Sequence, residues 1–385
     1  MKKIIIAVDS FKGSVSSAEA ANAVAQGIHD VYPLCEVITI PVADGGEGTV
    51  RALVEATGGK HIRCNTHDPL MNPIEAEYGI LADGRTAIIE TAAASGLALI
   101  PDNKRNPMET TTFGTGELIK SALMHGCRHI LVGLGGSATN DAGTGMLQAL
   151  GYRFLDKQQR ETGGSGKTLQ HICHIDESRK NLLLEACTFT AVCDVTNPFF
   201  GEQGAARIFA PQKGASPKTV EQLDNGLRHF ASLIREKKQK DIAGIPGSGA
   251  AGGMGGALMA FLNACLVPGI DVVLKAVDFE NKLQGADLII TGEGRIDAQT
   301  CMGKVPSGIL KASLPARVPV VAIAGQANDW DTLNRLGIQA VFPILPRPVS
   351  LEEAMNPQFT CMNIRQTVAQ ICRLIRIIKP DTASC

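Results

Sequence analysis

Carboxylates and cations recur in glycine-containing loops that follow short apolar runs of the chain. Phosphoryl transfer needs such groups. Carboxylates bind a metal ion or take the proton of the accepting hydroxyl, and cations neutralise the charge that develops on the phosphoryl group. Any one of these loops is also explained as a turn or a helix cap, but their repetition favours a catalytic role. The candidate groups are Asp9, Asp44, Glu47, Asp194, Asp297, Lys12, Lys213, Arg295 and Lys304.

A polar glycine loop, Gly135-Gly136-Ser137-Ala138-Thr139-Asn140-Asp141, follows the apolar run at 130–134. Such loops present backbone N–H groups and small hydroxyls to phosphate oxygens. A plain strand-to-helix turn capped by Asp141 is the alternative, although it needs one polar residue rather than four. We expect this loop and a second glycine run at 252–256 to hold ATP phosphates without a Walker lysine. The predicted nucleotide-binding residues are Gly135, Gly136, Ser137, Thr139, Asn140, Gly252, Gly253 and Gly255.

Two other functions stay open at this point. The pattern Gly133-x-Gly135-x-x-Ala138 follows an apolar run and has Asp156 in the range expected of a ribose-binding acid, which is typical of a nicotinamide-dependent oxidoreductase of a small hydroxy acid. A non-catalytic sugar-acid sensor would bind its ligand without chemistry. The stretch Gly163 to Thr168 resembles a phosphate-binding P-loop, but Glu161 stands where that loop requires its first glycine.

Composition and charge exclude several classes of partner. The chain of 385 residues has a formal net charge of −1, so it has no basic field that would collect nucleic acid or an anionic membrane. The uncharged stretch at 242–270 contains prolines and many glycines, which favours a buried loop and helix over a membrane span. Its 11 cysteines are scattered, and the apolar run at 4–8 stops at Asp9, too early for a secretory signal. We therefore expect a cytoplasmic protein.

The order of apolar runs predicts an α/β fold with two domains. Runs rich in Val and Ile that end in functional loops are typical of buried parallel strands, whereas the segments flanking Asp83-Gly84 predict an antiparallel hairpin. Because both ends of the chain show the parallel pattern, we expect residues 65–279 to form a mixed α/β domain inserted into a discontinuous domain of residues 1–64 and 280–385. The predicted buried strands lie at 4–8, 37–42, 130–134, 288–291 and 320–324, and a final helix at 364–378.

Five segments together resemble one family closely. They are Ala7-Val8-Asp9-Ser10-Phe11-Lys12-Gly13, Pro41-Val42-Ala43-Asp44-Gly45-Gly46-Glu47-Gly48-Thr49, the loop at 135–141, Pro211-Gln212-Lys213-Gly214-Ala215, and Thr291-Gly292-Glu293-Gly294-Arg295-Ile296-Asp297. This set resembles the type 1 glycerate kinase family. The resemblance implies a bacterial enzyme that phosphorylates D-glycerate to 2-phosphoglycerate with Mg²⁺ and ATP, in organic acid and glyoxylate catabolism. It also implies a flavodoxin-like parallel-sheet domain, an inserted second domain and an active site in the cleft.

The roles of individual residues follow from their chemistry. Asp194, Asp297 or Asp44 would hold Mg²⁺ or orient the glycerate hydroxyl, and Asp194 is the first choice for the base. Arg295 would bind the glycerate carboxylate through a bidentate pair. A homo-oligomer stays open. The predicted catalytic residues are Asp194, Lys12, Asp297 and Lys213, and the predicted substrate-binding residues are Asp9, Ser10, Asp44, Glu47, Arg295 and Lys304.

Overall fold

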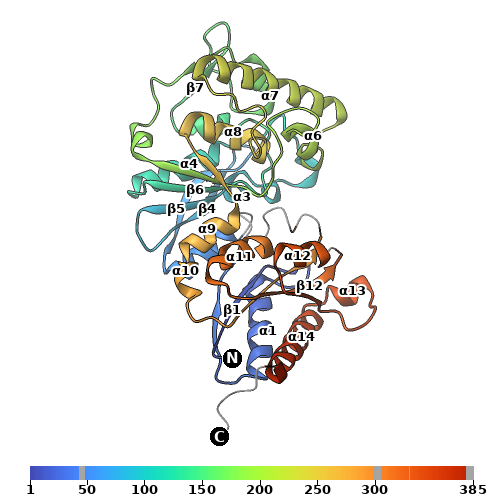
Figure 1. Ribbon diagram of the computed structural model, residues 1–385. Coiled ribbons are helices and arrows are strands. Elements are labelled where there is room, and N and C mark those ends of the chain that lie inside the picture. The colour runs from blue at the N-terminus through green and yellow to red at the C-terminus, as the bar shows by residue number, and fades with distance from the viewer. Residues whose placement is uncertain (43–47, 298–299, 301–304, 329, 379–385) are drawn as a thin grey trace. The chain divides into compact units, whose positions relative to one another are not determined.

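Figure 1 shows the computed structural model, which describes residues 1–42, 48–297, 300, 305–328 and 330–378. Its contacts divide the chain into two compact units. The first unit combines Met1–Asp44 with Ile270–Cys385, and the second is Gly45–Gly269. These limits differ from the boundaries expected at 64/65 and 279/280, because β3 (Lys60–His67) pairs along its length with β4 (Pro73–Ile80) and so belongs to the sheet of the second unit.

The first unit contains a five-stranded sheet in which every pairing is parallel. Counted within this unit alone, the strand order is 2-1-3-4-5, which is the flavodoxin-like order. The expected flavodoxin-like domain is therefore confirmed. Its strands are β1 (Lys3–Val8), β2 (Glu36–Thr39), β11 (Leu288–Ile296), β12 (Val320–Ala327) and β13 (Ala340–Pro343).

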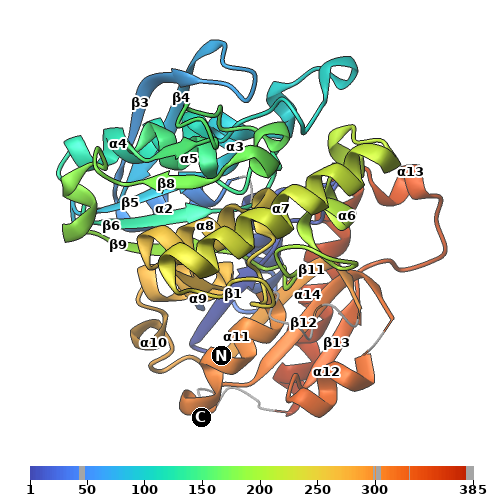
Figure 2. The same ribbon diagram turned by 90° about the horizontal axis from the view of Figure 1, so that it is seen from above.

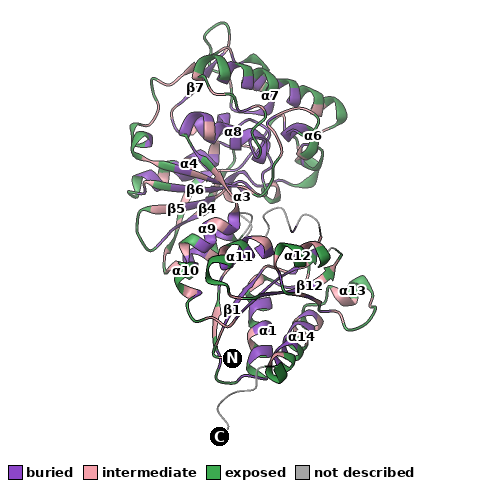
Figure 3. Ribbon diagram, viewed as in Figure 1, coloured by how far each residue is buried: buried purple, intermediate pink, exposed green. Residues whose placement is uncertain are grey.

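Helices cover both faces of this sheet because successive strand residues point to opposite sides. Ile4 and Ile6 of β1 pack in a core with α1 and α14, which lie side by side in Figure 1, whereas Ile5 packs in a core on the other face. Figure 3 shows β1 buried between these layers and the outer side of α14 exposed. The helices of this unit are α1 (Ser17–His29), α10 (Phe279–Lys282), α11 (Val305–Ser313), α12 (Trp330–Leu336), α13 (Leu351–Ala354) and α14 (Pro357–Ile378), and α9 (Gly269–Ala276) begins at its boundary.

The second unit has a mixed six-stranded sheet in the order β10-β9-β6-β5-β4-β3. The pairs from β10 to β5 are parallel, and β5-β4 and β4-β3 are antiparallel, so the hairpin expected around Asp83-Gly84 is confirmed. A two-stranded antiparallel sheet joins β7 to β8. The remaining strands are β5 (Thr86–Glu90), β6 (His129–Gly133), β7 (Arg153–Leu155), β8 (His174–Asp176), β9 (Thr188–Val192) and β10 (Cys265–Val267).

One large apolar core fills the second unit, and the glycine-rich α8 (Ala250–Leu262) is buried in it. The uncharged stretch around it is thus a loop and a buried helix, as expected. Among the described residues, no helix has the length and apolar character needed to cross a membrane. The long α7 packs against α8, and Figure 2 shows it crossing in front of that helix. The other helices are α2 (Thr49–Thr57), α3 (Thr91–Ser95), α4 (Phe113–Met124), α5 (Thr144–Ala149), α6 (Ala205–Phe209) and α7 (Pro217–Lys238).

Close backbone contacts explain the glycines of α8. The helix starts with a kink in which Ala251, Gly252 and Gly253 have positive φ. A Cβ on Gly252 would lie 2.1 Å from the carbonyl oxygen of Thr139, and one on Gly256 would lie 2.6 Å from the ring of Phe199. The first turn of α8 is therefore pressed directly against the polar glycine loop.

We expect Gly252→Ala to lower the free energy of unfolding by about 2 kcal/mol or more, because the new Cβ overpacks the contact with Thr139 and the residue keeps φ near +67°. Urea denaturation measures the change. Gly244→Ala is the matched control, since nothing lies within 4 Å of a Cβ there. Equal urea midpoints for the two variants would contradict the close contact.

Candidate active site

The carboxyl ends of three parallel strands meet at one edge of the second unit's sheet. The strand register aligns Glu90 of β5 with Gly133 of β6, and Gly133 with Val192 of β9. Asp194 follows β9 by two residues, is exposed, and accepts a 3.0 Å hydrogen bond from the N–H of Gly269 through Oδ1. Open α/β sheets bind ligands at this edge.

Only the beginning of the polar glycine loop is open to solvent. Gly135 is half-buried and Gly136 is exposed, with φ +71°. The carbonyl of Gly136 accepts from the N–H of Leu97 at 2.8 Å, and the N–H of Ala138 donates to the carbonyl of Ser95 at 2.8 Å. These bonds fasten the loop to the segment after β5, and residues 137–141 are buried. Of the five predicted nucleotide contacts in this loop, the first two thus have accessible backbone.

Lys213 lies beneath this loop with 3 % of its surface exposed. Its Nζ donates to Ser137 Oγ at 2.8 Å and to the carbonyl oxygen of Thr139 at 2.7 Å. Burial lowers the pKa of Lys213 to about 7, while the nearby carboxylate of Asp141 acts in the opposite direction. These two hydrogen bonds make Lys213 a support for the loop.

Asp141 is the fully buried carboxylate at the end of the loop. Its Oδ2 accepts from both the N–H and the hydroxyl of Thr112, at 2.8 and 2.7 Å. The N–H groups of Gly143 and Gly145, at the start of α5, also donate to it, at 3.0 and 3.2 Å. Burial raises the pKa of Asp141 above its usual value, and these hydrogen bonds oppose the shift. Asp141 thus caps α5, which was the alternative interpretation of this loop, but its bond to Thr112 had no signal in the sequence.

Three polar side chains in or next to this loop are buried without a hydrogen-bond partner in the described structure. They are Thr139, Asn140, with both amide atoms, and Ser248, whose hydroxyl precedes α8. Buried polar groups are almost always paired, so an unpaired cluster calls for a further partner such as water or a ligand. Sequence reasoning named Thr139 and Asn140 but missed Ser248, whose only signal is a hydroxyl in an uncharged glycine run.

The second glycine run faces the protein rather than an open surface. Gly252, Gly253 and Gly255 are buried, and a Cβ on Gly253 or Gly255 would meet Ala142 or the carbonyl of Gly247 at 3.0 or 2.5 Å. These close contacts with the protein explain why glycine is required at these positions, and no bound phosphate is needed to account for it.

In the first unit, predicted residues gather at the carboxyl ends of β1 and β11. Asp9 follows β1, and its N–H donates to Gly292 at 2.8 Å, while its Oδ1 accepts from the N–H of Ser10 at 2.6 Å. Arg295 is exposed, with Nε 3.4 Å from Asp297 Oδ2. A Cβ on Gly294 would lie 3.3 Å from the backbone nitrogen of Lys12, so the last part of β11 touches the loop after β1.

Glu293 is a buried carboxylate in this group that received no role from the sequence. It is 7 % exposed, and its Oε1 accepts a 2.6 Å hydrogen bond from the hydroxyl of Thr300, which also accepts from the N–H of Asp297 at 3.1 Å. Asp44, Glu47 and Lys304 lie outside the described residues. No group of three or more His, Cys, Asp or Glu side chains placed to hold a metal ion occurs within the part of the chain that the structure describes.

Comparison with known proteins decides the family. The model of the glycerate kinase family matches residues 4–376. The chain belongs to the glycerate kinase family. It is 47 % identical to a glycerate kinase of Bacillus subtilis, covering 98 % of both chains, and 45 % identical to the glycerate 2-kinase of Escherichia coli, covering 99 % and 98 %. A crystal structure from Salmonella typhimurium LT2, assigned as glycerate kinase 2, is 44 % identical, with a TM-score of 0.86 over 98 % of this chain and 99 % of that one.

Membership of the glycerate kinase family makes this chain a kinase, and the local structure removes the support for a nicotinamide site. A dinucleotide-binding glycine motif opens directly into a helix. Here the residues after β6 form a loop, and the next helix, α5, begins only at Thr144. Asp156, the expected ribose ligand, instead accepts from the N–H groups of Gln158 and Arg160 in a turn.

The burial of Lys213 gives a testable pH dependence. Its pKa of about 7 in the folded state lies below the 10.5 of a free lysine, so between these values only the unfolded chain keeps the proton. Stability therefore rises with pH from about 7 to 10, by at most about 1.4 kcal/mol per pH unit. We expect the stability of the Lys213→Met variant to lack this rise between pH 7 and 10.

Urea denaturation at several pH values checks the prediction. Lys218→Met, at an exposed lysine of α7, is the matched control and should keep the wild-type slope. A Lys213→Met profile parallel to that of the wild type would show that this lysine titrates normally.

Proposed function

We propose that this member of the glycerate kinase family transfers the γ-phosphoryl group of ATP to the 2-hydroxyl of D-glycerate, giving 2-phosphoglycerate and ADP. The observation that carries the proposal is the 45 % identity to the Escherichia coli protein named glycerate 2-kinase, over nearly the full length of both chains. In the reaction the bond between the γ-phosphorus and the β,γ-bridging oxygen breaks, and a bond from the glycerate oxygen to phosphorus forms. The hydroxyl proton must go to a base.

In the second unit, we assign phosphate binding to the open end of the polar glycine loop. Gly135 and Gly136 leave backbone accessible at the carboxyl end of β6, and Lys213 holds the following Ser137 and Thr139 from below. The ammonium would thus act through the loop rather than touch the phosphates.

Asp194 is the proposed base. It is exposed just after β9, and the N–H of Gly269 orients its carboxylate through Oδ1. A carboxylate held in this way can act as a general base. Carboxylates together with phosphate oxygens are the usual ligands of Mg²⁺, which needs only one or two side chains from the protein. Asp297 would hold this ion, with Asp194 as the alternative. Mg²⁺ would neutralise charge on the phosphates.

In the first unit, Arg295 is the proposed partner of the glycerate carboxylate. Its guanidinium is exposed and contacts only Asp297 among the ion pairs described, so it can form a bidentate pair with a carboxylate. Lys12, on the adjacent loop, would neutralise charge, and Asp9 and Ser10 would contact the glycerate hydroxyls. We further propose a cytoplasmic role in organic acid and glyoxylate breakdown.

Replacing the proposed base should stop turnover. We expect Asp194→Asn to lower kcat by about 10²-fold or more, because the amide still accepts from Gly269 but cannot take a proton. The assay couples ADP release from Mg·ATP and D-glycerate, and enolase identifies 2-phosphoglycerate directly. Asp241→Asn, at an exposed carboxylate of the same unit, is the control. Near-normal turnover of Asp194→Asn would remove the residue from this role, and glycerate binding by the wild type without ADP release would indicate a sensor.

Loss of the guanidinium should weaken glycerate binding selectively. We expect Arg295→Met to raise KM for glycerate about 10- to 100-fold, the effect of losing hydrogen bonds to a charged group, with little change in KM for ATP. Steady-state kinetics with each substrate varied in turn provide the test, and Arg335→Met in α12 is the control. Equal rises of both KM values would argue against a carboxylate contact.

A further inference from the structure

The ends of β11 and β12 extend beyond the other strands of the first unit's sheet. The ladder between these two strands continues to Ile296 and Ala327. Their outer neighbours stop earlier, since β1 reaches only Gly292 of β11 and β13 reaches only Ala324 of β12. The last residues of β11 and β12 therefore form a short two-stranded extension at the carboxyl edge of the sheet, the edge at which open α/β sheets bind ligands.

This extension carries two neighbouring pairs of polar side chains. Arg295 and Gln326 are partners in the parallel ladder, so both point to the same face, and the strands that carry them lie about 4.8 Å apart. Both residues are exposed. Along β11, the Nε of Arg295 lies 3.4 Å from the Oδ2 of Asp297. Along β12, the Nε2 of Gln326 donates a 3.2 Å hydrogen bond to the Oδ1 of Asn328.

The hydrogen bond between the two amides determines what they offer to a ligand. It uses the donor of Gln326 and the acceptor of Asn328, so the Oε1 of Gln326 and the Nδ2 of Asn328 are the atoms that remain. In the described part of the chain, neither atom makes a hydrogen bond. The N–H of Asn328 donates to the carbonyl of Ile296 at 3.0 Å, which fixes this residue to β11. Because a hydroxyl both donates and accepts, it can bind to this acceptor and this donor together.

The position of Gln326 beside Arg295 indicates which hydroxyl this is. Arg295 is the proposed partner of the glycerate carboxylate, so the inference rests on the proposed function. The carboxylate and the 3-hydroxyl lie at opposite ends of glycerate, a three-carbon acid whose length is similar to the separation of the two strands. We propose that Gln326 and Asn328 determine substrate specificity by binding the 3-hydroxyl, the one that is not phosphorylated, while Arg295 holds the carboxylate.

Calorimetric titration of the full chain with D-glycerate and D-lactate tests this role without using turnover. D-lactate keeps the carboxylate and the 2-hydroxyl but lacks the 3-hydroxyl, and saturating Mg·ADP is present in both titrations. We expect the wild type to bind D-lactate at least about tenfold more weakly than D-glycerate, because both hydrogen bonds are lost. Gln326→Met should weaken D-glycerate binding about five- to tenfold and leave D-lactate binding unchanged. The double variant Gln326→Met/Asn328→Leu should bind the two acids equally.

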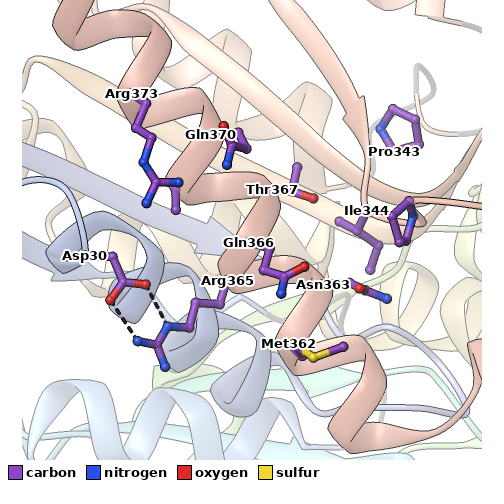
Figure 4. Close-up of a pocket in the computed structure, with 12 residues that line it drawn as sticks. Asp30, Pro343, Ile344, Met362, Asn363, Arg365, Gln366, Thr367, Gln370 and Arg373 are labelled. Carbon is purple, nitrogen blue, oxygen red and sulfur yellow. Dashed lines mark hydrogen bonds and ion pairs between the residues drawn. The ribbon is translucent and has the colours of Figure 1, made fainter.

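The same substitution at a glutamine of α14 is the matched control. Gln366 is exposed and lines a cavity of about 580 Å³, which Figure 4 shows. Gln366→Met should leave both dissociation constants unchanged. Loss of D-glycerate binding in this variant would place the ligand in that cavity and overturn the proposal.

Three other results overturn the proposal as well. Equal affinity of the wild type for the two acids means that no group recognises the 3-hydroxyl. Equal weakening of both acids by Gln326→Met indicates damage to the whole site rather than loss of one contact, and unchanged D-glycerate binding removes the residue from this role. ADP release tests the proposed function separately. A wild type that discriminates between the acids as expected but releases no ADP would contradict phosphoryl transfer and leave the specificity of this site in place.

Discussion

The candidate site of the second unit depends on a carboxylate that water cannot reach. Asp141 receives hydrogen bonds from Thr112 before α4 and from the first N–H groups of α5, so it ties two helix starts to the end of the polar glycine loop. A buried carboxylate is costly unless its oxygens are fully used. Here four donors and the field of Lys213 offset that cost. Removing any one partner would leave a buried charge or polar atom unpaired. Because this is costly, the partners of Asp141 are held in one rigid arrangement.

Close backbone packing completes this rigidity. Lys213 binds the loop from one side, and the first turn of α8 is pressed on it at Thr139, where no side chain fits at Gly252. The left-handed backbone of that turn is strained for Ala251, and the surrounding contacts maintain it. A preorganised loop loses little entropy when it binds phosphate. The glycines at the start of α8 resemble a phosphate-binding run in the sequence. In the structure they allow the helix to pack closely against the polar glycine loop.

Sequence patterns predicted the elements much better than the pairings between distant groups. The apolar runs located four of the five strands expected to be buried, because a parallel strand with helices on both faces must be apolar throughout. The fifth, expected at 37–42, is the edge strand β2, which ends at Thr39 and has no buried residue. The start of α14 at Pro357 was missed. The expected boundary at 64/65 cuts through β3, because the alternating polar pattern of this strand does not reveal its partner. The chemistry of Lys213 was recognised but not its burial. Its partners Ser137 and Thr139 lie more than 70 positions away in the chain, and no local pattern encodes such a contact.

Glu293 shows why carboxylates at the ends of parallel strands need not share one role. It ends the buried run of β11, and the register of β1 and β11, which pairs Val8 with Gly292, brings Asp9 to the same level. The hydroxyl of Thr300 links the carboxylate of Glu293 to the backbone N–H of Asp297, so Glu293 helps to fix the backbone that carries Asp297. Asp297 is the more accessible of the two and pairs with Arg295. The buried Glu293 thus fits a residue that orients this segment, while Arg295 and Asp297 are the more accessible groups to which the proposed function gives roles.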